Sequence, residues 1–468
     1  MIKIIVGVFL TVYLVISAIV VLYWRDINFD PSGSDLLIFF ALLPVAITAF
    51  LVMPYIIYHW IKEQKNKQND PQLSDEIAIE ELQPEPVEWI NLNVYRAYAL
   101  NALGENHLII DAIREFKSPE LDDKLLNGYG LPILSYRISD LDVEQDEEDE
   151  YSFKRQYRIH QLILTQLEQQ TEILWEISEH LKKSALFYDT QISQSYRMHP
   201  AWIDPQAEYH DGEEDTPSVQ QVYRLNKLKI HLILAEELLH VWDEQDSEQL
   251  ISDYLSQLNY IPEVFHVEHH YWGAETSYSE WIHLLQSIEK DESSISLVFI
   301  VDSEIDQDTL DEKIWISEQY IPAEYISSCC LASPKIQIEN VLPTKTLDIA
   351  INEKQLKQSL DRYNIDHQFK VENEQPFTIL LDDITQLKTL KKIEQNLANT
   401  NIEQHHYLML YPTLGNTQSL AKIFGFTLAF QFDDALMTMV YTTQNPDVQT
   451  FIQTYQSESD INPEQQNV

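Results

Sequence analysis

Two long apolar segments at the start of the chain constrain its fold more than any other feature. Residues 4–24 carry no charged side chain, and residues 36–57 form a second uncharged run after a short polar connection. Because about 20 helical residues cross the hydrocarbon core of a bilayer, each run is long enough to span a membrane. The prolines of the second run, Pro44 and Pro54, are tolerated in membrane helices. The sequence therefore predicts a two-helix transmembrane hairpin over residues 1–61.

A cleaved signal peptide is the alternative interpretation of the first run. Signal peptides have a shorter apolar core and small residues at the cleavage site. The run here is longer, ends in Tyr23-Trp24-Arg25 and is followed at once by a second apolar run, which favours two membrane spans. Lysines flank both ends of the hairpin: Lys3, Lys62, Lys65 and Lys67. Because positive residues stay inside, both termini are predicted to be cytoplasmic.

The rest of the chain is acidic and contains enough apolar residues to build real cores. The formal charge of −44 repels nucleic acid and favours basic partners, so nucleic-acid binding is excluded on charge. Cys329 and Cys330 are adjacent and are the only cysteines, a pattern that excludes a disulfide framework and suits a reducing cytoplasm. Residues 62–86 are predicted to be a polar linker, and residues 457–468 a disordered acidic tail.

A dense acidic run lies in the middle of the chain. Residues 140–150 contain eight acids in eleven positions. We interpret this run as a solvated loop, with a docking site for a basic partner as the alternative. A calcium-binding loop needs a glycine at its tight turn, and this run has none.

The segment His266-Val267-Glu268-His269-His270 suggests metal chemistry at first sight. Helical zinc motifs place a glutamate next to one of two histidines spaced by four, whereas Glu268 stands midway. On a strand, His266, Glu268 and His270 would share one face, as the residues of an ordinary polar face also do. Metal binding by these three side chains is therefore the runner-up hypothesis, and no metal or cofactor is predicted.

Buried strands are predicted after residue 290. Residues 294–301 form a continuous apolar run that ends in Asp302-Ser303, a pattern typical of a strand covered on both faces. A second strand of small and apolar residues contains Cys329 and Cys330, which we interpret as core residues. These strands, with the helices predicted around them, indicate an α/β body with a covered central sheet.

Two predictions concern the chain before these strands. Residues 119–138 contain Pro119, Gly128, Gly130 and Pro132, so this region is predicted to be rich in loops. Apolar residues recur every three or four positions over 151–183, which predicts one long amphipathic helix.

Several short motifs resemble the thiolase-like fold, the architecture of ketoacyl synthases. In that family a buried strand ends near Asp-Ser, a Pro-Gly-Glu loop precedes a strand of small residues, and Gly-His begins a helix in the second half. The matching positions here are Asp302, Ser303, Pro322, Glu324, Gly415 and Asn416. The resemblance implies a first thiolase-like half with helical insertions over 87–340 and a second half over 341–456. It also implies a homodimer.

The catalytic parts of that family are missing from the sequence. Ketoacyl synthases place a nucleophilic cysteine at a helix start upstream of the Asp-Ser strand end, and residues 271–278 contain no cysteine. Asn416 stands in place of the catalytic histidine, and asparagine is no general base near neutral pH. Ser277 with His266, His269 or His270 is an alternative nucleophile and base, but no Gly-x-Ser-x-Gly elbow supports it. We therefore predict no catalytic residues and no enzyme activity.

A membrane anchor joined to a thiolase-like body without catalytic residues is similar to the layout of type VI secretion accessory proteins that load lipase effectors. This resemblance implies a multi-pass protein of the bacterial inner membrane. It would act as an adaptor or scaffold that binds an effector or a subunit of the secretion machine. Two alternatives remain open: a metal-dependent or hydrolytic enzyme that uses the 266–270 cluster, and a structural subunit of an envelope machine.

Overall fold

The computed structural model places residues 85–468 in one compact unit. The described residues are 86–141, 155–198, 222–314, 320–353, 356–363, 377–381, 393–395, 406–410, 419–433, 437–442 and 445–456, with single residues elsewhere. The predicted membrane hairpin, the acidic tail, Gly415 and Asn416 lie outside them. None of the helices in the described part combines the length and the hydropathy that a membrane span needs.

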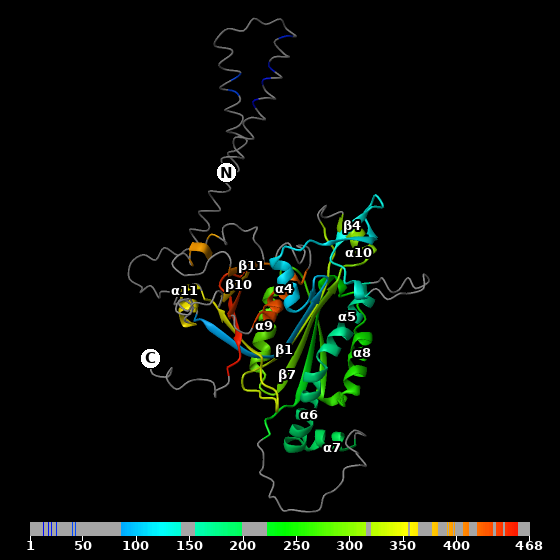
Figure 1. The fold of residues 1–468 in the computed structure, drawn as a ribbon, viewed down its shortest axis with the longest axis vertical. Coiled ribbons are helices and arrows are strands. Elements are labelled where there is room, and N and C mark those ends of the chain that lie inside the picture. Colours follow the sequence, from blue (N-terminus) through cyan, green and yellow to red (C-terminus); the bar gives the residue numbers. More distant parts are fainter. Residues whose placement is uncertain are drawn as a thin grey trace, which may run out of the picture. The chain divides into compact units, whose positions relative to one another are not determined.

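Besides the two-residue β2 (Gly104–Glu105), which pairs with the first strand, the first half of the unit contributes five strands to one mixed sheet (Figure 1). In chain order they are β1 (Glu88–Asn101), β5 (Lys227–Ala235), β6 (Phe265–Trp272), β7 (Ser294–Ser303) and β8 (Glu324–Ala332). Across the sheet they lie in the order β6-β5-β7-β8-β1. β8 runs antiparallel to both of its neighbours, whereas β5 is parallel to β6 and β7.

The second half repeats this arrangement. Its strands are β9 (Lys345–Ile351), β10 (Phe377–Leu381), β11 (Tyr407–Met409), β12 (Met437–Tyr441) and β13 (Gln449–Thr454). They lie in the order β11-β10-β12-β13-β9, and β13 is antiparallel to both neighbours. If the five strands just given for each half are numbered in chain order, both halves have the spatial order 3-2-4-5-1. In both, the fifth strand is antiparallel to its neighbours. The two first strands, β1 and β9, pair antiparallel and join the halves into one sheet.

Corresponding helices cover one face of this sheet. α9 (Ser277–Lys290) follows the third strand of the first half, and α14 (Ala421–Leu428) follows the third strand of the second half. The two helices contact each other, and their apolar side chains form one hydrophobic core with strands of both halves. The body is therefore a mixed α/β structure made of two repeats with a shared core.

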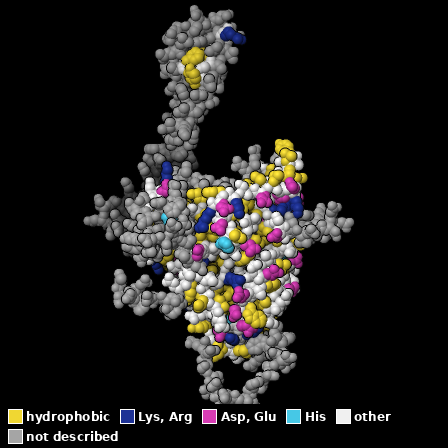
Figure 2. All heavy atoms as spheres, viewed as in Figure 1, with side chains coloured by type: hydrophobic (Ala, Val, Ile, Leu, Met, Phe, Trp, Pro, Cys, Tyr) yellow, Lys and Arg dark blue, Asp and Glu magenta, His cyan; other side chains and the backbone are white. Residues whose placement is uncertain are grey.

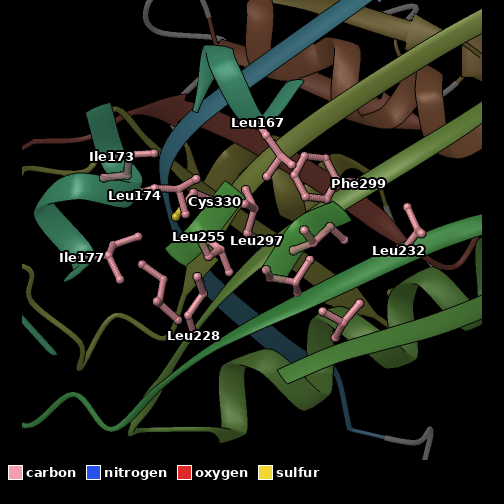
Figure 3. Close-up of a cluster of buried hydrophobic side chains, with 14 of the residues drawn as sticks. Leu167, Ile173, Leu174, Ile177, Leu228, Leu232, Leu255, Leu297, Phe299 and Cys330 are labelled. Atoms are coloured by element: carbon pink, nitrogen blue, oxygen red, sulfur yellow. The ribbon is translucent and has the colours of Figure 1, made fainter. Parts of the chain in front are cut away.

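A second hydrophobic core covers the other face of the first half (Figure 3). It is formed by α5 (Arg155–Gln169), α6 (Thr171–Tyr188) and α8 (Glu244–Gln257) together with the sheet. Cys330 of β8 belongs to this core, while its neighbour Cys329 belongs to the core under α9. Successive strand residues point to opposite faces, and both faces are covered, so the apolar runs predicted to be buried strands are confirmed.

The helix predicted over 151–183 is two helices in the structure. α5 ends at Gln169 and α6 begins at Thr171, on either side of the buried Gln170. The amide of Gln170 donates a 2.7 Å hydrogen bond to Ser328 Oγ in β8. Apolar residues recur on both sides of Gln170, so their periodicity gives no sign of the break.

The region predicted to be rich in loops contains a β-hairpin whose register shifts between Asp122 and Leu126. α4 (His107–Arg114) is followed by β3 (Glu120–Leu126) and β4 (Pro132–Ser135), which pair antiparallel. The inner side of this hairpin packs against α10 (Gln307–Ile314), where Leu125 and Leu310 share a small buried core. The prediction of irregular structure was wrong here because the short strands have no clean apolar alternation.

Candidate functional site

Four buried polar side chains gather where β7 ends and β8 begins. Asp302 and Ser303 are the last residues of β7, Glu304 follows them, and Glu324 is the first residue of β8, paired with Ser303 in the sheet. Each has at most 1% of its surface exposed. Three of them are positions that carry the thiolase-like resemblance, so the structure brings these motif residues together.

Cations from two helices compensate this buried acidity. Arg155 Nη2 donates to both carboxylate oxygens of Asp302, at 2.8 and 3.0 Å. Arg158 donates to Glu324, and Lys313 Nζ lies 2.7 Å from Glu304 Oε1. Ser303 Oγ donates to Glu324 Oε1 at 2.6 Å.

These pairings determine what the cluster can do chemically. Burial raises the pKa of Glu304 to about 7, even though the nearby Lys313 and Arg155 favour its ionised form. Burial also disfavours the charge on Arg155, but Asp302 and Glu304 outweigh it and raise the pKa of this guanidinium. Removing one partner of a buried ion pair leaves an uncompensated charge. These buried ion pairs therefore hold α5 and α10 against the sheet, which is a structural role.

The same cluster holds the chain that leaves the hairpin. The backbone nitrogen of Tyr136 donates to Pro322 O at 2.9 Å, and that of Glu324 donates to Tyr136 O at 3.0 Å. Ile138 N donates to Glu324 Oε2 at 2.9 Å. The motif positions Pro322 and Glu324 thus act as anchors for the segment that follows β4.

The hairpin and the nearby helix α4 expose an unusual number of large apolar side chains. Tyr129 is 90% exposed and Phe116 81%. Leu121 and Leu134 lie opposite each other across β3 and β4 and are both exposed. We call this set the hairpin patch: Leu108, Phe116, Leu121, Leu126, Tyr129, Leu131 and Leu134. In Figure 2, hydrophobic side chains gather at the end of the hairpin.

The exposed loop of the hairpin is held by its own hydrogen bonds. Asn127 Oδ1 accepts from the backbone nitrogens of Tyr129 and Leu131, both at 3.0 Å. Asn127 N donates to Leu131 O at 2.9 Å, and Gly130, at a φ of 72°, closes the turn onto Asn127 O. The two most prominent loop side chains are therefore presented on an ordered backbone.

A cleft lies beside the hairpin patch. Its volume is about 920 Å³, and segments 100–105, 117–124 and 135–140 line it. Buried Asp122 stands in this lining and accepts from Ser135 Oγ and Arg137 Nε, both at 2.8 Å. Burial opposes ionisation of Asp122, but these two donors outweigh it and lower its pKa.

Both cysteine thiols lie in the interior of the sheet. Cys329 and Cys330 lie within β8 with no exposed surface, and burial raises the pKa of each thiol. Because the thiolate is the nucleophile, neither is activated. The prediction that both are core residues is confirmed.

Ser277 is the first residue of α9 and is fully buried. Its Oγ has no hydrogen-bond partner among the described residues. None of the three histidines considered as its base is bonded to it there: His266 is exposed, His269 bonds to Ser247 at 2.8 Å, and His270 contacts His231. The structure does not bring the hypothetical serine–histidine pair together.

Two of the three side chains of the runner-up metal hypothesis lie together in the structure, and the third lies apart from them. His266 is exposed and does not belong to the cluster, whereas Glu268 and His270 meet His231 from the neighbouring strand β5. His231 Nδ1 is 3.1 Å from His270 Nε2 and 3.3 Å from Glu268 Oε2. A hydrogen bond from His231 lowers the pKa of Glu268 to about 2, and burial lowers that of His270 to about 4. Sequence reasoning missed His231 because it is a single histidine in an apolar strand.

No family model matches the sequence, and no curated protein matches it. Among solved structures, the body is similar to the ketosynthase from module 6 of the bacillaene synthase of Bacillus subtilis 168, with a TM-score of 0.44 and 8% identity over 78% of this chain and 72% of that one. The ishigamide ketosynthase/chain length factor gives a TM-score of 0.40 and 7% identity over 77% and 98%.

A third similar structure is the peroxisomal 3-ketoacyl-CoA thiolase of Saccharomyces cerevisiae, with a TM-score of 0.29 and 7% identity over 49% of this chain and 84% of that one. That thiolase is described as five-layered and constructed from two core domains of identical topology. All three TM-scores are below 0.5. The strand order of this chain itself shows two repeats that are joined through β1 and β9.

Proposed function

We propose that this body is a protein-binding adaptor or scaffold and that the hairpin patch receives its partner. The hairpin patch carries the proposal. Scattered apolar residues are normal on protein surfaces, but a concentration of them marks an interaction site. The order that Asn127 imposes on Tyr129 and Leu131 reduces the entropy lost on binding.

The chemistry of the partner follows from the charges around the hairpin patch. Asp111, Glu115, Glu120 and Asp123 are exposed beside it, against Arg114, Lys117 and Lys124. The acidic run over 140–150 follows in the sequence shortly after β4. We infer a protein partner whose apolar contact surface is surrounded by Lys and Arg. Such complementarity mainly raises the association rate and the specificity.

The absence of catalysis is part of the proposal. Among the described residues, both thiols are buried, the motif carboxylates of Asp302 and Glu324 are bound by arginines, and Ser277 Oγ has no hydrogen-bond partner. Covalent acyl transfer needs an activated nucleophile with a base in reach. Asn416 in place of the family histidine points the same way.

The wider role rests on the resemblance of the layout to type VI secretion accessory proteins. It would place the protein at the bacterial inner membrane, with two spans, and make an effector or a machine subunit its partner. A structural subunit of an envelope machine is the competing role, and the identity of the captured protein separates the two.

Photo-crosslinking in cells tests the proposal on the full chain. A photoreactive phenylalanine analogue replaces Tyr129 or Leu131, and the control carries it at Leu342, which is 70% exposed in the loop between β8 and β9. We expect an adduct with a basic protein at the two patch positions and none at the control. An adduct with a second copy of this chain, or no adduct at either patch position, would contradict the proposal.

The identified partner then allows a quantitative measurement. Central interface residues contribute about 2 kcal/mol or more, so Tyr129→Ser and Leu131→Ser should each weaken binding at least about tenfold. Leu342→Ser should leave the affinity unchanged. Added salt should slow association, because the charges act at long range. Equal affinity for all variants would refute the assignment of the surface.

A further inference from the structure

We infer that His231, Glu268 and His270 form a binding site for a divalent transition-metal ion, with zinc as the ion that the ligands fit. The inference is independent of the proposed adaptor function. Two parallel strands in register position the three side chains: His231 of β5 is paired with Glu268 of β6, and Ile233 is paired with His270. Because residues two apart on a strand share a face, the sheet itself directs all three toward one point.

The distances fit a tetrahedral ion. Zinc binds His nitrogen and carboxylate oxygen at about 2.0–2.2 Å, so tetrahedral ligand atoms lie roughly 3.3 Å apart. His231 Nδ1 is 3.1 Å from His270 Nε2 and 3.3 Å from Glu268 Oε2, and the remaining edge, from His270 Nε2 to Glu268 Oε2, is 4.0 Å. The Glu268 side chain is 36% exposed, so it has room to shorten that edge.

Hydrogen bonds within the cluster leave its lone pairs unsatisfied. His231 Nδ1 carries at most one proton, yet both Glu268 Oε2 and His270 Nε2 lie within reach of it. Without a cation, the single proton on His231 Nδ1 can therefore bond to Glu268 Oε2 or to His270 Nε2, and the other atom is left without a donor from this ring. A bound cation accepts a lone pair from all three atoms.

The surroundings leave a position open for a further ligand. The His231 side chain is 4% exposed, whereas His270 is 23% and Glu268 36% exposed, so solvent reaches the cluster at Glu268 and His270. Lys229, two residues before His231, is paired with Asp291 at 2.7 Å, and its charge is compensated there. Three protein ligands with one free position are typical of zinc sites that bind water or another molecule.

The ligand types select the metal. Two imidazoles and one carboxylate suit zinc and other late transition metals, whereas magnesium and calcium prefer oxygen ligands throughout. An ion here would tie β6, the outermost strand of the first half, to β5.

Zinc uptake by the purified full chain tests the site. The metal-free protein is dialysed against micromolar zinc and its metal content is measured. The variants are Glu268→Gln and His270→Asn, and His266→Asn is the control because this exposed histidine lies on the same strand outside the cluster. We expect the wild type and the control to hold one more zinc per chain than the two variants. Zinc should also raise their unfolding temperature, because a ligand bound only to the folded state stabilises it.

Two results would overturn the inference: no zinc uptake by the wild type, or equal zinc content in the wild type and in both variants. Cobalt gives a second readout that does not depend on stability. The visible absorption of cobalt in a tetrahedral site should appear in the wild type and the His266→Asn control and be absent from the variants. Absorption of equal strength in all four proteins would place the ion elsewhere. Unfolding temperatures without metal show that the isosteric Glu268→Gln protein is folded.

Discussion

Glu304 shows how burial alters a single side chain. Its carboxyl has no solvent exposure and one close cation, Lys313. Burial raises its pKa from 4.5 to about 7, because water no longer solvates the charge and the ion pair compensates only part of the loss. The folded protein therefore binds this proton more tightly than the unfolded chain does.

This difference predicts a pH dependence of stability. Between about pH 4.5 and pH 7 the folded state holds more protons at Glu304 than the unfolded state, so its contribution to stability falls as pH rises and levels off above 7. Glu304→Gln removes that dependence. The variant should gain on the order of 3 kcal/mol relative to the wild type between pH 4.5 and pH 8.

Urea unfolding of both proteins at several pH values measures the effect. Glu312→Gln, on the exposed side of the same helix α10, is the control and should follow the wild type. A constant difference between Glu304→Gln and the wild type over this range would show that Glu304 keeps an ordinary pKa.

At the scale of elements, the start of α5 connects three parts of the fold. Arg158 reaches Glu324 at the start of β8, and its Nη2 also donates to Ile138 O at 3.2 Å, in the segment that leaves the hairpin. Both partners of the Arg158–Glu324 ion pair are almost fully buried. The pair therefore ties helix, sheet and hairpin together, and the motif residue Glu324 is a structural residue.

A buried ion pair of this kind costs most when half of it is removed. Arg158→Leu should lower the free energy of unfolding by about 3–5 kcal/mol, because Glu324 would remain buried without its cation. The double variant Arg158→Leu/Glu324→Leu should recover part of this loss. Urea unfolding followed by tryptophan fluorescence measures both. A double variant less stable than Arg158→Leu would show that the pair stabilises beyond charge compensation.

At the scale of the whole molecule, two repeats share one sheet and one core. β1 and β9 pair across the junction, and α9 contacts α14 under the sheet. Trp281 of α9 and Phe426 of α14 are fully buried with ring centroids 5.6 Å apart in an edge-to-face arrangement. Unfolding of one half exposes apolar surface of the other, so the body should unfold cooperatively.

A double-mutant cycle at this contact measures the coupling of the halves. Trp281→Ala and Phe426→Ala should each cost about 3–5 kcal/mol. Together they should cost about 0.5–1.5 kcal/mol less than the sum, because the aromatic contact is lost only once. Strict additivity, or two separate unfolding transitions in the wild type, would show that the halves are independent.

The sequence predicts best where the signal is local. The run over 294–301 is apolar throughout because β7 is covered on both faces, and this pattern sufficed to predict a buried strand. The adjacent cysteines were recognised as core residues for the same reason. The position of Asp302 and Ser303 at a strand end also follows from the local change from apolar to polar residues.

Tertiary structure decided whatever depends on pairing between distant segments. The membrane hairpin over 1–61 is the strongest constraint that the sequence places on the chain. It stays a prediction from the apolar composition of these residues alone. By contrast, Gln170 at the break between α5 and α6 bonds to Ser328, His231 joins Glu268 and His270 through strand register, and Arg158 reaches Glu324. Leucines such as Leu121 and Leu134 are exposed at the surface because no other part of the described chain covers them. Strand order and burial are set by contacts between residues that are distant in the sequence. Neither the type of a single residue nor its spacing from its neighbours predicts such a contact.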